Sequence, residues 1–266
     1  MTFVFDEAIQ VSARSADTFS FATDQRYFNF DSAFGGWLAA AMLACTESHA
    51  DYRGQLVTQD MHFHASVRAP RLICRVELLE RRRSLDFWHV RCFTEQGDQV
   101  LASANLVCGA NTESSNQYAQ APKAVRTVEE AYPLTQDGTR PQWFAHYDIR
   151  LAKGRPFAAN ETLESVTWLR DADSRPLDVR AVTAIVDTPM PRTFFLSEKR
   201  VFASTVSLST HLYASEAEIS AVGSDFVRLD TTSHGVRNSL INAESYLYRT
   251  DGLLLACSYQ TALFRE

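Results

Sequence analysis

The longest apolar run in the chain, residues 34–45, constrains its fold more than any other feature. After Gly35 and Gly36 the run consists almost wholly of helix formers, with Ala and Leu dominant and no β-branched residue. We therefore expect a helix over residues 34–49. A helix that is apolar nearly all round must be covered nearly all round. The rest of the chain has to supply that cover.

The residues that flank this helix predict a sheet around it. Segments of apolar and aromatic residues, separated by short turns, are typical of successive antiparallel strands. Two aromatic patches before the helix, 3–5 and 19–21, predict one or two edge strands. Four longer strands are predicted after the helix: 56–67, 72–79, 87–93 and 100–107.

A polar segment divides the chain. Residues 111–145 are rich in Asn, Ser, Gln and Pro and show no sustained periodicity, which predicts a linker. Beyond it, apolar spacing predicts a second helix over 177–186, which the following Asp-Thr-Pro-Met-Pro sequence ends. Further strands are predicted at 164–169, 204–213, 226–231, 240–248 and 253–264.

The two halves resemble copies of one unit. Residues 99–104 and 253–258 are similar and each follows a Gly/Asp turn, in an alignment that places Ala256 opposite Ala102. Each half then contains a strand region, one helix and four strands. We predict an N-terminal repeat over 1–110, a linker over 111–145 and a C-terminal repeat over 146–266.

The composition limits the classes of binding partner and the cellular compartment that we expect for this protein. The net charge of −6 argues against a nucleic-acid partner, and 45% apolar residues are enough for a real core. Five scattered cysteines without a Cys-x-x-Cys pair are typical of free thiols in a reducing compartment. No signal peptide is evident, and no apolar run approaches the roughly 20 residues that span a membrane. These features predict a soluble cytoplasmic protein with no membrane partner.

Four stretches, in this order, resemble the double-hotdog acyl-CoA thioesterases of the thioesterase II type, over almost the whole chain. They are the glycine pair with its alanine-rich helix, the segment 62–70, the end of the second predicted helix at 184–187, and the strand segments 204–208 and 256–260. The resemblance implies an α+β double hotdog, in which two tandem hotdog repeats each wrap an antiparallel sheet around a central helix. It also implies hydrolysis of an acyl-CoA substrate without a cofactor.

The resemblance implies one active site. Asp187, Thr205 and Gln260 match the family's aspartate, threonine and glutamine, which orient and activate a water for attack on the thioester carbonyl. Leu106 stands opposite Gln260 in the repeat alignment, so the first repeat lacks this set. Thioester hydrolysis also needs donors for the developing oxyanion, and backbone N–H groups near Gly35 and Gly36 suit that role.

Each of these residues also has a purely structural interpretation. Asp187 suits a turn or a helix end, although the helix dipole disfavours a carboxylate at a helix C-terminus. Thr205 is an ordinary strand residue. Gln260 is the most informative, because Gln is a poor strand former that needs hydrogen-bond partners when it is buried.

The coenzyme contacts are a separate hypothesis. A basic hairpin turn of three arginines is either a solvated turn or a site for the phosphates of CoA. The family often has an Arg-Gly stretch before the penultimate strand, whereas here Gly235 precedes the arginine. The candidate CoA-binding residues are Arg81, Arg82, Arg83 and Arg237.

Other functions remain open from the sequence. A non-catalytic acyl-CoA-binding hotdog protein would keep the fold, and a hotdog enoyl-CoA hydratase or dehydratase would pair a histidine such as His211 or His234 with a carboxylate. No Gly-x-Ser-x-Gly motif is present. His62, His64 and His89 lack a completing ligand at a recognised spacing, so no metal site is predicted. Double-hotdog units often pair further, which is compatible with a homo-oligomer.

Overall fold

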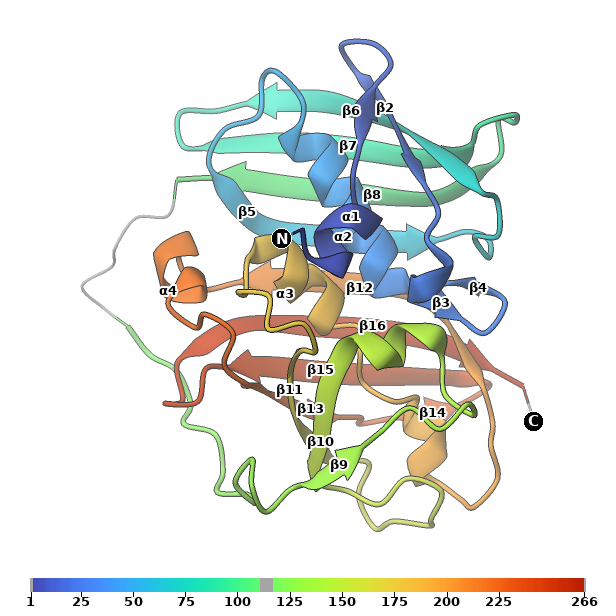
Figure 1. The fold of residues 1–266 in the computed structure, drawn as a ribbon, viewed down its shortest axis with the longest axis vertical. Helices are drawn as coiled ribbons and strands as arrows, with labels where there is room; N and C mark the ends of the chain where they lie inside the picture. The colour runs from blue at the N-terminus through green and yellow to red at the C-terminus, as the bar shows by residue number, and fades with distance from the viewer. Residues whose placement is uncertain (1, 111–116, 266) are drawn as a thin grey trace.

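One large antiparallel sheet forms most of this protein (Figure 1). The structure is a computed structural model, and it describes residues 2–110 and 117–265. Among these residues fourteen strands join one sheet, in the order β1-β2-β6-β7-β8-β5-β12-β16-β15-β13-β11-β10-β9, with β14 paired to β15. Its strands in chain order are β1 (Ser12–Ala13), β2 (Thr18–Ala22), β5 (Gln55–Phe63), β6 (Arg71–Arg81), β7 (Leu85–Thr94), β8 (Val100–Gly109), β9 (Tyr132–Leu134), β10 (Tyr147–Lys153), β11 (Ser165–Asp171), β12 (Ala203–Leu212), β13 (Val227–Thr232), β14 (Val236–Arg237), β15 (Leu240–Tyr248) and β16 (Leu254–Phe264).

The remaining elements are short, apart from one helix. Two small strands form a separate hairpin just before that helix. These elements are α1 (Val4–Ala8), η1 (Gln25–Tyr27), β3 (Phe28–Asn29), β4 (Ser32–Ala33), α2 (Gly35–Glu47), η2 (Gln142–His146), α3 (Val179–Ile185), η3 (Arg192–Phe195) and α4 (Glu216–Ser220).

Helix α2 is the buried helix that the sequence predicts. Every residue from Gly36 to Thr46 is buried, and Trp37 donates its indole N–H to the Ala8 carbonyl. Helix α3 packs against it. The two helices approach closely, because a Cβ at Gly36 would lie 2.4 Å from the Ala184 carbonyl oxygen. Glycine at this position therefore sets the distance between the two helices.

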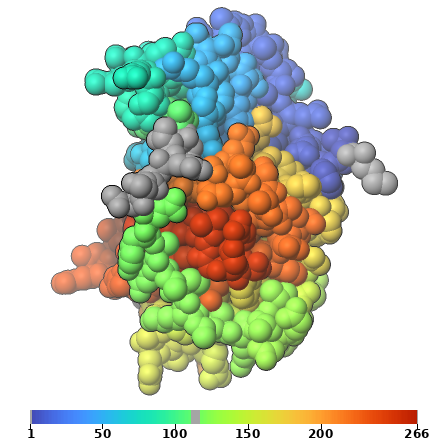
Figure 2. Space-filling view, turned by 90° about the vertical axis from the view of Figure 1, so that its left-hand side faces the viewer, coloured from blue at the N-terminus to red at the C-terminus, as the bar shows by residue number. Residues whose placement is uncertain are grey.

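Strands β5 and β12 join the two halves of the sheet. Met61 pairs with Leu208 and Gln59 pairs with Thr210 in this antiparallel ladder. One core cluster runs through both halves and includes side chains of α2 and α3. In Figure 2 the blue and cyan residues of the N-terminal half gather at one end of the molecule, green and yellow residues form the other end, and the red C-terminal residues lie between them. The halves thus share a sheet and a core.

Most predicted elements are confirmed to within a few residues. The patch 3–5 is an exception, because it lies in α1 rather than in an edge strand. Phe5 and Ala8 are one helical turn apart and both are buried, so a short helix covers the core better than a strand would. Strand β10 was not predicted. Within the described residues, no helix is long and apolar enough to cross a membrane.

The predicted linker lies partly outside the described residues, which omit 111–116. Its later part is built into the fold. Tyr132–Leu134 form β9, which pairs with β10 at the edge of the sheet. Trp143 and Phe144, in η2, are buried in the main core cluster. This segment therefore contributes both a strand and core side chains.

Candidate active site

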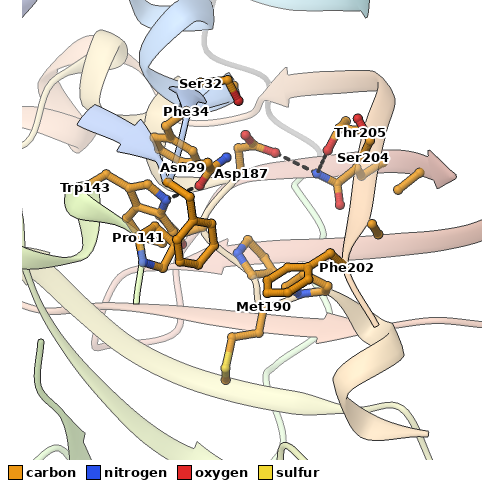
Figure 3. A pocket seen from close by; sticks show the side chains of 18 of the residues that line it. Asn29, Ser32, Phe34, Pro141, Trp143, Asp187, Met190, Phe202, Ser204 and Thr205 are labelled. Carbon is orange, nitrogen blue, oxygen red and sulfur yellow. Dashed lines mark hydrogen bonds between the residues drawn. The ribbon is translucent and has the colours of Figure 1, made fainter. Parts of the chain in front are cut away.

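Asp187, Thr205 and Gln260 meet in the structure. Figure 3 shows Asp187 and Thr205 close to each other, with dashed lines for these hydrogen bonds. The Gln260 side-chain amide donates to Asp187 Oδ1 at 2.6 Å and to Thr205 Oγ1 at 3.0 Å. The three residues come from the end of α3, from β12 and from β16, which are far apart in sequence. The structure therefore brings together the three residues that the sequence predicts as catalytic.

Local structure explains why these side chains converge. Helix α3 ends at Ile185, and the Asp187 N–H donates to the Ala184 carbonyl in the last turn. Strand β12 has a register shift against β16 between Thr205 and Ser207. Such a bulge bends a strand and re-aims neighbouring side chains. Thr205 lies beside this bulge, where it can reach the amide of Gln260.

Burial dominates the electrostatics of Asp187. Removal from water raises its pKa to about 7, because the charged form loses solvation. Hydrogen bonds from the Gly36 backbone N–H and the Gln260 side chain act in the opposite direction and stabilise the carboxylate. A carboxyl group with a pKa near neutrality can both accept and return a proton at neutral pH.

The two glycines predicted as oxyanion donors lie beside Asp187, at the start of α2. A Cβ on Gly35 would lie 2.7 Å from Asp187 Oδ2, so the carboxylate sits directly against this backbone. Gly36 directs its N–H to Asp187. Gly35 itself lines the neighbouring cavity. The N-terminal half thus supplies backbone to a carboxylate that belongs to the C-terminal half.

A cavity of about 870 Å³ opens beside these residues. Asp187, Thr205 and Gln260 all line it, together with Gly35. Aromatic side chains supply much of its wall, which favours an apolar ligand with a few polar groups at fixed points. These aromatic residues are Phe30, Phe34, Phe63, Trp143, Phe144, Phe157, Phe194 and Phe202.

Two groups of contacting rings line this wall. Trp143 stacks on Phe34, with ring centroids 4.5 Å apart, and its indole N–H donates to Asn29 Oδ1 at 2.6 Å (Figure 3). Phe202 contacts Phe30 edge-on at 5.6 Å. The sequence alone does not predict these residues as part of a site. The adjacent Trp143 and Phe144, within an otherwise polar segment, were the signal that could have revealed part of the wall.

The predicted CoA-binding arginines lie elsewhere. None of them is among the described residues that line the cavity. Arg81 makes ion pairs with Asp86 and Asp51 at the end of β6. Arg82 and Arg83 follow in the exposed turn before β7, and Arg237 lies in β14.

The histidines considered for other chemistry also lie outside the cavity, with one exception. His211 contacts Tyr259, and His234 lies 3.7 Å from Glu244. His64 lines the cavity and hydrogen-bonds to Ser103. Among the residues that the structure describes, no group of three His, Cys, Asp or Glu side chains could hold a metal ion.

Comparison with solved structures identifies the fold. A hotdog-fold protein of unknown function from Alicyclobacillus acidocaldarius is 23% identical, with a TM-score of 0.95 over 100% of this chain and 99% of that chain. The TesB protein of Mycobacterium avium subsp. paratuberculosis is 14% identical (TM-score 0.81), and acyl-CoA thioesterase II TesB2 from Mycobacterium marinum is 16% identical (TM-score 0.79). Each of these two comparisons covers 98% of both chains. The chain therefore adopts a hotdog fold.

Two protein-family models match most of this chain. Residues 23–109 match the acyl-CoA thioesterase N-terminal domain, and residues 122–264 match the acyl-CoA thioesterase C-terminal domain. No curated protein matched the chain. The two matched domains account for most of the sequence. The protein therefore belongs to the acyl-CoA thioesterase family and is a thioesterase.

Proposed function

We propose that the protein hydrolyses acyl-CoA thioesters with a water that Asp187 activates and that Thr205 and Gln260 orient. The observation that carries the proposal is the position of the Gln260 amide, which bonds both Asp187 and Thr205 at the wall of the cavity. A water beside these groups would have a base on one side and polar groups to fix its direction. The burial of Asp187 supports the role of base, because it raises the pKa toward neutrality.

The proposed reaction uses one proton relay. Asp187 takes a proton from water as the water oxygen bonds to the thioester carbon, which gives a tetrahedral oxyanion. The Gly35 N–H, at the positive end of α2, is the proposed oxyanion donor, while the Gly36 N–H stabilises the base. Collapse of the intermediate breaks the carbon–sulfur bond. The proton on Asp187 then passes to the leaving sulfur, so that free acid and CoA thiol form.

We also propose that the hotdog fold is doubled, with repeats over 1–110 and 146–266. Residues 111–145 connect the repeats, and the later part of this segment packs into the fold. The strand order supports the doubling, because β2-β6-β7-β8-β5 mirrors β11-β13-β15-β16-β12 across the central junction. The bulges support it as well. Strand β5 shifts register against β8 between Leu56 and Thr58, as β12 does against β16 between Thr205 and Ser207.

The same correspondence supports a single site per chain. Leu56 stands beside the β5 bulge where Thr205 stands beside the β12 bulge, and Leu106 aligns with Gln260. At the other ends of the two helices, Glu47 at the end of α2 forms an ion pair with Arg180 at the start of α3. Apolar residues and an ion pair thus occupy the positions that correspond to the proposed site.

The proposed reaction would belong to lipid metabolism in the cytoplasm. The state of the cysteines supports this location, because Cys45, Cys74, Cys92, Cys108 and Cys257 are all free and buried. Free thiols of this kind are typical of a reducing compartment.

The test measures CoA thiol release from a panel of acyl-CoAs by the wild type and by Asp187→Asn. We expect a loss of about a hundred- to ten-thousandfold in kcat for the variant. Asp60→Asn is a matched control, because Asp60 lies on β5 outside the cavity. Full activity in Asp187→Asn would discard the site. Binding of acyl-CoA without release of thiol would favour the non-catalytic binder, and hydration of an enoyl-CoA without thiol release would favour the hydratase.

A further inference from the structure

Two arginines line the cavity and lie over rings of its aromatic wall. The Arg140 guanidinium lies over the Phe144 ring, 5.0 Å from its centroid, and the Arg200 guanidinium lies over the Phe157 ring at the same distance. Both arginines line the same cavity as Asp187. Arg200 is exposed and Arg140 is partly exposed, so both can be reached from solvent. Stacking on a ring orients the planar guanidinium before any ligand arrives.

The N–H donors of these two arginines make few and long contacts with other described residues. Arg140 Nη1 is buried and has no hydrogen-bond partner among the described residues. Its ion pair with Asp137 is long, at 3.5 Å. Arg200 reaches only the backbone carbonyl and hydroxyl of Thr139, both at 3.4 Å, and pairs with no carboxylate in the described part of the chain. A buried guanidinium donor without an acceptor is costly, and a ligand oxygen that bonded to it would remove that cost.

Two other arginines, one in the cavity wall and one outside it, contrast with this pair. Arg192 also lines the cavity, but its donors are committed to the carbonyls of Leu163 and Met190 and to the Ser165 hydroxyl. In the N-terminal half, Arg53 binds the Asp86 carboxylate through two bonds of 2.8 Å. Arg192 uses its donors within the fold and Arg53 binds a carboxylate closely, whereas Arg200 binds no carboxylate and Arg140 Nη1 binds no acceptor in the described part of the chain.

Asp137 is the one described carboxylate within ion-pair distance of either arginine. Its Oδ1 accepts bonds from the Thr139 N–H and hydroxyl, so this carboxylate mainly holds the turn on which Arg140 and Thr139 sit. The pKa of Asp137 lies below its usual range for the same reason. It offsets part of the charge of Arg140 and leaves that of Arg200 uncompensated.

We propose that Arg140 and Arg200 bind the phosphates of the thioester carrier, and that the carrier is CoA. This inference rests on the proposed function, because it assigns the carrier end of the same substrate. Guanidinium forks bind phosphate oxygens bidentately, which the unused donors of this pair allow. The acyl group and the thioester would then lie inward, along the aromatic wall toward Asp187. The assignment replaces the Arg81–Arg83 turn as the site for the phosphates.

The test compares four thioesters of one acyl group: acyl-CoA, acyl-3′-dephospho-CoA, acyl-4′-phosphopantetheine and acyl-pantetheine. Each removes phosphate from the one before. For acyl-CoA, we expect Arg140→Gln and Arg200→Gln each to raise KM roughly tenfold with little change in kcat, because each loses a charge-assisted contact in the bound state. For acyl-pantetheine, which has no phosphate, we expect both variants to match the wild type.

The step of the series at which the variants rejoin the wild type shows which phosphate each arginine meets. A wild-type KM for acyl-4′-phosphopantetheine as low as that for acyl-CoA would show that the nucleotide part of CoA contributes nothing to binding. That result would reassign the carrier to a protein-borne phosphopantetheine and overturn the CoA assignment. Arg126→Gln is the matched control, because Arg126 is exposed and lies outside the cavity.

The failure of this inference differs from the failure of the proposed function. Equal KM values for acyl-CoA in the wild type, Arg140→Gln and Arg200→Gln would overturn the inference. If Arg82→Gln raised the KM instead, the phosphates would be assigned to the basic turn. Absence of turnover on all four thioesters would count against the proposed hydrolysis. In that case, CoA binding to the two variants, measured by calorimetry, would still decide whether the arginines hold the phosphates.

Discussion

A mostly buried carboxylate relies on the donors that the protein provides, and Asp187 has two of them. The Gly36 N–H and the Gln260 amide hold its charged form, while burial opposes that form and raises the pKa to about 7. Two of the three residues in this set carry recognisable sequence signals. Asp187 stands at a helix end where the dipole disfavours it, and Gln260 stands in an apolar strand. Thr205 carries no such signal by itself.

The pKa of Asp187 predicts a pH profile. Because a general base must be ionised, we expect kcat/KM to rise tenfold per pH unit below about pH 7 and to level off above it. Steady-state rates across this range provide the measurement. A flat profile would contradict the assignment of Asp187 as base.

Replacement of Gln260 tests the amide contact. We expect Gln260→Leu, which installs the residue found at position 106, to lower kcat roughly ten- to a hundredfold by removing a charge-assisted hydrogen bond. The same change removes an interaction that lowers the pKa of Asp187, so the midpoint of the pH profile should move upward. A reduced rate with an unmoved midpoint would show that Gln260 acts without contacting the base.

The burial of Asp187 also predicts that the stability of the protein depends on pH. The folded-state pKa of Asp187 lies above its ordinary value of 3.8, so the native state binds the proton more tightly than the unfolded state does. This contribution is fully present below about pH 4 and is lost as the pH rises through 7. Urea unfolding should show that Asp187→Asn gains stability relative to the wild type over this window, by at most about 4 kcal/mol. A difference that is constant with pH would contradict the raised pKa.

At the scale of elements, the glycine pair at the start of α2 serves two different contacts. A Cβ on Gly36 would meet the Ala184 backbone carbonyl at 2.4 Å, and a Cβ on Gly35 would meet Asp187 Oδ2 at 2.7 Å. The sequence predicts the helix and its burial, because composition and periodicity are local properties. It could not predict that these glycines face α3, since that contact depends on how two distant helices cross.

Substitution of alanine for each glycine in turn distinguishes the effects of these two contacts. We expect Gly36→Ala to destabilise the fold by about 1–3 kcal/mol, because a backbone carbonyl cannot move aside as a side chain can. Gly35→Ala should act mainly on kcat, because it displaces the Asp187 carboxylate. Thermal unfolding and steady-state kinetics on both variants provide the comparison. Equal losses of stability would show that the two glycines have the same structural role.

At the scale of the whole molecule, the halves share one core. Strands β5 and β12 pair directly, and the main cluster contains buried side chains from both halves, including Trp88 and Leu208. We therefore expect one cooperative unfolding transition rather than two. Calorimetry provides the measurement, because the calorimetric and van't Hoff enthalpies should agree. Two resolved transitions would show that the halves unfold independently.

The strands could be predicted from the sequence better than the residues of the cavity wall. Most strands could be predicted, because each follows from alternation and turn residues within a short segment. Much of the cavity wall could not, because many of its members come from the β3–β4 hairpin, from η2 in the predicted linker and from the segment around η3. None of these segments has a periodic pattern. Their side chains acquire a shared role only after the sheet and the helices have placed them together.

Trp143 gives the molecule an intrinsic optical reporter. Its indole lies in the cavity wall, stacked on Phe34 and hydrogen-bonded to Asn29. The other tryptophans, Trp37, Trp88 and Trp168, are buried outside the residues that line the cavity. A ligand that enters the cavity changes the surroundings of this one indole and leaves the others untouched. Fluorescence emission therefore follows occupancy in the unlabelled protein, without any need for turnover.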